Sequence, residues 1–118
     1  MANPNIVNVA TINGKTDVFA LTTTETNLVT ATANTVFKIN TILISNIDGT
    51  NAADVTIKYN DGSDDRAIAS TISVPADATL TVVDKNSSFY LEENEIIKGT
   101  ASANSDLECL ISYEIISD

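Results

Sequence analysis

The segment from residue 35 to residue 59 constrains the fold of this chain more than any other part of the sequence. It contains two runs rich in β-branched residues, and the connection between them carries Asn46 and Asp48-Gly49. β-Branched side chains are stiff at χ1 and pack well on a pleated surface, and Asp-Gly readily supplies the positive-φ positions of a tight turn. The segment therefore predicts an antiparallel hairpin, and we expect the rest of the chain to form a stack of similar hairpins.

The composition assigns the whole chain to the all-β class. Val, Ile and Thr together supply 39 of the 118 residues, whereas the helix formers Leu, Lys and Glu number 7, 5 and 6. No long segment shows an apolar stripe at helical spacing. A chain of this length is one domain by the usual size range and can bury a core without disulfides or a metal. We see no linker or second domain.

The spacing of apolar runs and turn residues predicts eight or nine short strands, and therefore an antiparallel two-sheet sandwich or jelly-roll-like fold. A Gly-containing turn is expected at 60–63, and Pro75 is expected to end a strand because it cannot donate to a central ladder. The candidate strand segments, of which eight or nine are expected to form, are residues 6–12 (ended by Asn13-Gly14), 18–21, 28–33, 35–47, 55–59, 68–74, 80–83, 89–91, 96–97 and 107–115.

Two of these strands carry further information. The strand at 35–47 does not alternate cleanly, so either both of its faces are partly buried or a bulge switches its phase; we favour a central strand. In the last strand, Leu107, Cys109, Ile111, Tyr113 and Ile115 are all two residues apart. A slip of one residue would expose this whole row, so its register should be tightly determined.

The charge balance excludes some partners. Six Lys and Arg against 16 Asp and Glu give a net charge of −10. Phosphate backbones and anionic lipids are bound by Lys and Arg, so this balance argues against nucleic acid and membrane as partners. The longest strongly apolar run, residues 42–44, is far too short to span a bilayer, and the N-terminus has no signal-peptide pattern. We therefore expect a soluble protein made in the cytoplasm without export.

The sequence offers little for catalysis or metal binding. It contains no histidine, the commonest general base and a standard zinc ligand. Cys109 is the single cysteine, and its place in the apolar row predicts a buried structural thiol. Asp61, Asp64 and Asp65 cluster in one turn and suggest calcium, but their spacing fits no EF-hand and a solvated turn is the better interpretation. We expect no metal and no cofactor.

A second acidic group, formed by Glu92, Glu93 and Glu95, also has two interpretations. Paired carboxylates can act in glycosidases, but these act in clefts lined with aromatic residues, and this chain has no Trp, three Tyr and three Phe. A charged turn is the better interpretation. The phase of the strands places Tyr59 and Tyr113 in the core, which also weighs against a glycan-binding module. We expect no enzymatic activity.

Three phrases carry a resemblance to a known group of proteins. They are Ser-Asn-Ile-Asp-Gly-Thr-Asn-Ala-Ala-Asp-Val-Thr-Ile from residue 45, Ile-Ser-Val-Pro-Ala-Asp-Ala-Thr-Leu from residue 72, and Ile-Ser-Tyr-Glu-Ile-Ile from residue 111. With them, the chain from residue 6 to residue 118 resembles small virion structural proteins of tailed phages, especially phages of marine cyanobacteria. The resemblance implies a head decoration (cement) protein on the capsid exterior, bound to the major capsid protein and self-associating, with trimers favoured. It brings no catalytic residues.

The same resemblance leaves two other roles open, a tail, neck or fibre component and a receptor- or glycan-binding module. For the decoration role, residues 1–5 are expected to form an extended polar arm before a single domain at 6–118, because Pro4 disfavours helix in the residue before it. The candidate contact residues to the capsid or a sister subunit are Ala2, Asn3, Pro4 and Asn5. We expect this arm to become ordered on assembly.

Overall fold

The computed structural model describes residues 4–117, and these form nine strands and no helix. The all-β prediction is confirmed, and the strand number agrees with it. The strands are β1 (Thr11–Ala20), β2 (Thr26–Thr30), β3 (Thr35–Asn46), β4 (Ala53–Asn60), β5 (Asp65–Val74), β6 (Thr79–Val83), β7 (Phe89–Leu91), β8 (Ile96–Ala101) and β9 (Leu107–Ser117).

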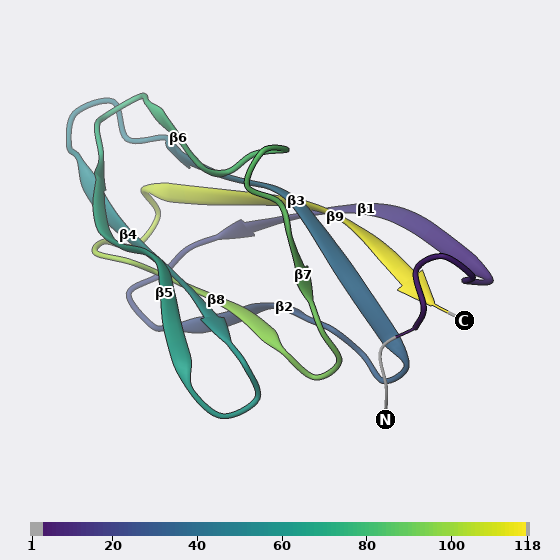
Figure 1. The fold of residues 1–118 in the computed structure, drawn as a ribbon. Coiled ribbons are helices and arrows are strands. Elements are labelled where there is room, and N and C mark those ends of the chain that lie inside the picture. The colour runs from purple at the N-terminus through teal and green to yellow at the C-terminus, as the bar shows by residue number, and fades with distance from the viewer. Residues whose placement is uncertain (1–3, 118) are drawn as a thin grey trace.

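The strands form two antiparallel sheets that pack face to face (Figure 1). We call the first sheet A; its order is β1-β9-β3-β6, and β7 also pairs with β3. The second, sheet B, has the order β2-β8-β4-β5. Most successive strands lie in different sheets, so the chain crosses repeatedly over the core of a two-sheet sandwich. Among the described strands, β1 stands at one end of sheet A and pairs with β9 alone.

The hairpin predicted around Asp48-Gly49 is wrong. β3 lies in sheet A and β4 lies in sheet B, so the connection between them crosses from one sheet to the other. Gly49 does not have a positive φ, whereas Gly62, in the turn between β4 and β5, does (φ 94°). Of the described strands, only β4 and β5 both follow each other in the chain and pair directly. Alternation in the sequence identifies which face of a strand is apolar, but it does not identify the neighbouring strand. Here the apolar face of β3 and that of β4 are buried against each other, so the two strands lie on opposite sides of one core.

The first predicted strand is also misplaced. Residues 6 and 7 form a turn closed by the amide of Asn8, which donates to the carbonyl of Asn5 at 3.0 Å. β1 then begins at Thr11 and continues without interruption through Asn13-Gly14 to Ala20. Ten residues of β9 pair with it in unbroken register, and this long partner keeps Asn13-Gly14 extended. The expected strand at 18–21 is largely the end of β1.

The irregular alternation of β3 has a local cause. The register of β3 against β9 shifts between Ile39 and Thr41, so Asn40 forms a bulge. Before the bulge Phe37 and Ile39 face the core, and after it Ile42 faces the core. β3 is also central, with β9 on one side and β6 and β7 on the other, as predicted. The predicted central position of this strand is confirmed, and so is the bulge that was its alternative explanation.

The core lies between the two sheets. On β9 the predicted row is buried as far as Tyr113, whose ring stacks on that of Phe37 with centroids 5.1 Å apart. Beyond Tyr113, Ile116 is buried on the outer face and Ile115 is only partly buried. The largest fully buried side chains are Leu21, Ile39, Ile42, Ile44, Ile57, Leu91, Ile97, Leu107, Ile111, Val55, Val74 and Cys109.

Candidate interaction surfaces

The described part of the predicted arm lies on the outer face of sheet A. Pro4 is buried, and together with Ile6, Val36 and Tyr90 it lines an open hollow of about 260 Å³. Asn5 is exposed, and its side-chain oxygen accepts a hydrogen bond from the amide of Val7 at 3.0 Å. Ala2 and Asn3 lie outside the described residues. Within the isolated chain, the end of the arm is thus already attached to its own sheet.

Two buried side chains of sheet A are not part of the core between the sheets. Val36 and Ile116 are register partners on β3 and β9 and are 4% and 5% exposed. They point away from sheet B, so burial on that side requires a cover, and the hollow that Val36 shares with Pro4 and Ile6 shows where the N-terminal segment lies. Loss of Pro4 would therefore uncover apolar surface at Val36.

A second hollow lies on sheet A next to its β1 edge. It measures about 340 Å³, and its lining includes Val18, Ala20, Ser45, Glu108 and Leu110. Most of this surface is aliphatic or uncharged, and Glu108 is its one carboxylate. A shallow surface of this kind suits contact with another protein better than it suits a reaction.

The thiol beside this hollow is chemically inactive. Cys109 is 1% exposed, and burial raises its pKa to about 12. Because the thiolate is the reactive form, a thiol with this pKa is protonated at neutral pH. The prediction of a buried structural cysteine is confirmed.

The edge of sheet A formed by β1 is mostly exposed. Its side chains alternate between the two faces of the sheet: Val18 lies opposite Leu110 on the outer face, and Lys15 lies opposite Tyr113 on the core-side face. Tyr113 donates a hydrogen bond to Asp17 Oδ2 at 2.6 Å, and burial followed by this contact raises the pKa of Tyr113. The sequence does not indicate this edge, because Asn13-Gly14 predicts a turn in the middle of the strand.

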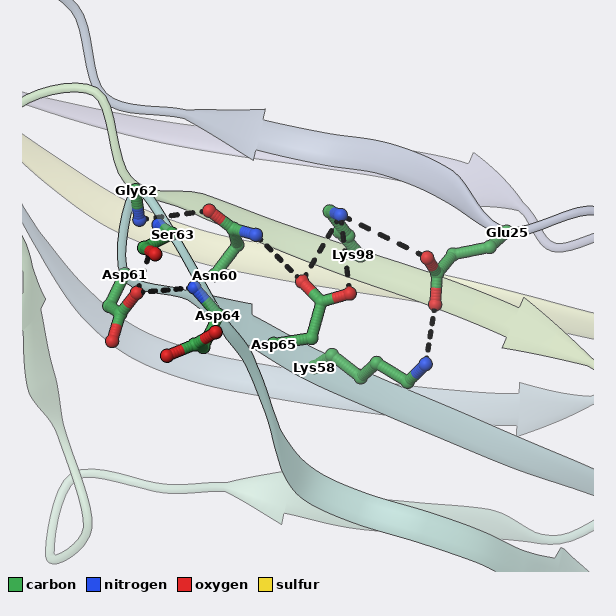
Figure 2. Close-up of polar contacts among 9 residues, drawn as sticks. All are labelled: Glu25, Lys58, Asn60, Asp61, Gly62, Ser63, Asp64, Asp65 and Lys98. Atoms are coloured by element: carbon green, nitrogen blue, oxygen red, sulfur yellow. Dashed lines mark hydrogen bonds and ion pairs between the residues drawn. The ribbon is translucent and has the colours of Figure 1, made fainter.

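The acidic turn between β4 and β5 is held by its own backbone (Figure 2). Asp61 Oδ1 accepts hydrogen bonds from the amides of Ser63 and Asp64 at 3.0 and 2.7 Å, and these bonds lower the pKa of Asp61. Asp65 Oδ1 accepts from Asn60 Nδ2 at 2.7 Å. Within residues 4–117, no group of three or more Asp, Glu, Cys or His side chains is arranged to hold a metal ion. The geometry is that of a polar turn.

Asp65 also belongs to an ion-pair network on the outer face of sheet B (Figure 2). Lys58 and Lys98 are register partners on β4 and β8, so their charges lie side by side. Lys58 Nζ is 2.9 Å from Glu25 Oε2, and Lys98 Nζ is 3.1 Å from Asp65 Oδ1 and 3.9 Å from Glu25 Oε1. The two carboxylates neutralise a like-charge pair that would otherwise oppose the pairing of β4 with β8.

Carboxylates of the second acidic group, at residues 92–95, also accept hydrogen bonds within the fold. Glu95 Oε1 accepts hydrogen bonds from the hydroxyl of Tyr59 and, at 2.7 Å, from the amide of Glu92. Glu93 Oε2 accepts from the amide of Asn34. Burial, and next the contact with Glu95, raise the pKa of Tyr59. These carboxylates stabilise the turn between β7 and β8.

The tyrosines lie close to where the strand phase placed them. Tyr113 is buried, and Tyr59 is partly buried against the core. Tyr90 is 42% exposed beside the hollow at the N-terminal segment. Among residues 4–117 no helix is long and apolar enough to cross a membrane.

Comparison with known proteins identifies the fold but no family. The sequence matches no known family profile and no curated protein. Among solved structures, the chain is similar to a protein of the Bacillus endospore appendages, described as disulfide-linked pili, with a TM-score of 0.54 and 12% identity over 92% of this chain and 88% of that one. It is also similar to a chain of the acid-stable capsid of the Helicobacter pylori bacteriophage KHP30, with a TM-score of 0.53 and 8% identity over 92% and 89% of the two chains. At these identities the likeness establishes a shared fold.

Proposed function

We propose that this chain is a non-enzymatic structural protein of a phage particle, and specifically a decoration protein that binds the outside of the head and stabilises it. The observation that carries the proposal is the arrangement of sheet A, where a long free edge, a shallow aliphatic hollow and the N-terminal segment lie on one side of a rigid sandwich. These features suit contact with other proteins and support the proposal. The fold it shares with a phage capsid protein and the resemblance to virion proteins support the same role.

The partner in this proposal is the major capsid protein, and residues 1–5 supply part of the contact. Pro4 already lies against the sheet, while Asn5 is exposed beside it. On the head, this segment extends over the capsid surface or a sister subunit, and Ala2 and Asn3 lengthen the contact. Ordering of such a segment costs conformational entropy, which the buried contact area offsets.

The charge of the chain is consistent with this location. A net charge of −10 favours solubility and reduces non-specific adhesion to nucleic acid. In the proposed role the protein is made in the host cytoplasm and ends on the capsid surface. Specific contact then depends on the less charged surface of sheet A.

One observation favours a second role. The similarity to a pilus protein shows that this fold also occurs in filamentous appendages, and the alternative is therefore a tail, neck or fibre component. The two roles differ in copy number, because a decorated head carries hundreds of sites and a tail or neck carries few.

The experiment is co-sedimentation of the purified protein with expanded heads that lack it, read as copies bound at saturation. Hundreds of copies per head support the decoration role. A few copies assign the protein to the portal, neck or fibre. No binding refutes the decoration role and favours the adhesion role, with a glycan-binding screen as the next measurement. A variant that begins at Ile6 tests the arm, and Asn86→Ala, in an exposed turn, is the matched control. Full-strength binding by the shortened variant would exclude the arm from the contact.

A further inference from the structure

The β1 edge of sheet A has the properties of a pairing template. β1 is ten residues long, pairs with β9 without a register shift, and contains no proline. Exposed edges of this length pair with other strands unless bulges, prolines or charges prevent it. The features on β1 that oppose pairing are two charges on its core-side face, Lys15 and Asp17, whose Nζ and Oδ1 atoms are 3.7 Å apart. Any partner of this edge must match both of them.

We propose that the partner is β1 of a second copy of this chain, paired antiparallel about a two-fold axis at Thr16. Opposite residues of an antiparallel pair point to the same face, so a two-fold axis perpendicular to the sheet must pass through a residue position. An axis at Lys15 or at Asp17 would place like charges opposite each other. An axis at Thr16 places Lys15 of each copy opposite Asp17 of the other and overlaps residues 12–20 of both strands.

The outer face of β1 matches the same register. Val18 is 71% exposed and would lie opposite Gly14 of the second copy. A Cβ added at Gly14 would meet no atom within 4 Å, so there is space above this glycine for a neighbouring valine. Ile12, which is 54% exposed, would lie opposite Ala20. Each large exposed side chain of the edge thus faces a small residue, so this register brings no two bulky side chains into the same space.

The charges make this pairing selective. In a pair with a strand of another protein that lacks the opposite charges, Lys15 would be buried without a carboxylate or would lie opposite a like charge. In the two-fold pair, Lys15 lies opposite a carboxylate of the second copy. Asp17 is positioned in advance, because it accepts the hydrogen bond of the buried Tyr113 hydroxyl. The pair would join sheet A of two copies into one continuous sheet. A two-fold pair through this edge differs from the trimer implied by the sequence resemblance, and it does not depend on attachment to a phage head.

Disulfide cross-linking tests the register. In the proposed pair the two Thr16 Cα atoms are about 4.5–5.5 Å apart, within the range of a disulfide. The two Val18 residues, on the same face, are offset by four positions, or about 13 Å, and cannot be bridged. Mild oxidation of Thr16→Cys should therefore give a covalent dimer, whereas Val18→Cys should stay monomeric. Cys109 is 1% exposed and should remain unmodified in both variants. Equal cross-linking of the two variants would overturn the proposal.

Sedimentation equilibrium of the full chain tests the charges. We expect a monomer–dimer equilibrium for the wild type, and Lys15→Glu should raise the dissociation constant about tenfold or more because two attractive pairs become repulsive. The double variant Lys15→Asp/Asp17→Lys restores opposite charges across the axis and should restore the dimer. Circular dichroism checks that each variant is folded. A wild type that is monomeric at all concentrations or trimeric, or a double variant as weak as Lys15→Glu, would refute this pairing.

Discussion

Asn46 provides the sharpest test of the fold, because it holds the crossing from sheet A to sheet B. Its side chain is 3% exposed and makes hydrogen bonds with three backbone groups. Nδ2 donates to the carbonyl of Asn51 at 3.0 Å and to that of Val74 at 2.9 Å. Oδ1 accepts from the amide of Asp48 at 2.9 Å. One amide thus connects the end of β3, the crossing segment and the end of β5.

Replacement of Asn46 by alanine should lower the free energy of unfolding by about 3 kcal/mol. The bonds with the more exposed Asn51 and Asp48 contribute about 0.5 kcal/mol each, and the buried carbonyl of Val74, left without a donor, costs about 2 kcal/mol. Val74 is fully buried, so its carbonyl bears this cost most directly. With an unfolding entropy of about 2.1 cal/mol/K per residue, the expected decrease in Tm is about 12 °C for a chain of this length.

Urea and thermal unfolding followed by circular dichroism measure this change. Asn46→Asp keeps the acceptor for the amide of Asp48 but loses both donated bonds, so it should be destabilised as well. Asn86→Ala, in an exposed turn, is the control and should stay within about 0.5 kcal/mol of the wild type. If Asn46→Ala also stays within that range, the crossing does not depend on this amide and the reasoning is wrong.

Three further predictions concern packing, pH and the thiol. Gly99→Val should destabilise the fold by about 1–3 kcal/mol in urea unfolding, because a Cβ at this position would lie 2.7 Å from Cδ1 of Leu28, which packs against the core; a wild-type midpoint would show that the surrounding side chains adapt. Hydrogen bonds lower the pKa values of Asp48, Asp61 and Asp65 below the ordinary 3.8. Their stabilisation is therefore present above about pH 4 and lost as the pH falls through the folded-state pKa values, so an acid titration of Tm should decline there, and less steeply in Asp61→Asn. Cys109 should not react with a thiol reagent at pH 8 until the protein unfolds, and rapid labelling of the native protein would contradict its burial.

Local features of the chain were predictable to the extent that they depend on nearby residues. The turn at 60–63 forms where a positive φ is needed and Gly62 supplies it, and β5 ends at Val74 before Pro75. The burial of Tyr113 also followed from the spacing of its row. The Asp48-Gly49 connection misled because the same residues suit a hairpin turn and a crossing between sheets.

The interaction surfaces were harder to predict than the strands. The candidate contact residues at 2–5 follow from the resemblance and from the position of Pro4, and their role remains a prediction. The β1 edge gives no local signal, because a strand becomes an edge only when the order of the sheet is known. Asn13-Gly14 even pointed the other way, since nothing in their neighbourhood shows that a ten-residue stretch of β9 holds them extended.

The sequence by itself determined the all-β class, most strand positions, the inert environment of Cys109 and the acidic surface. These properties depend on side-chain shape, alternation and charge, which each short segment carries within itself. Only the tertiary structure decided that β3 and β4 face each other across the core, that Asn46 connects the two sheets and that β1 has a free edge. Those features arise from contacts between residues far apart in the chain, and short-range patterns do not specify which partners will meet.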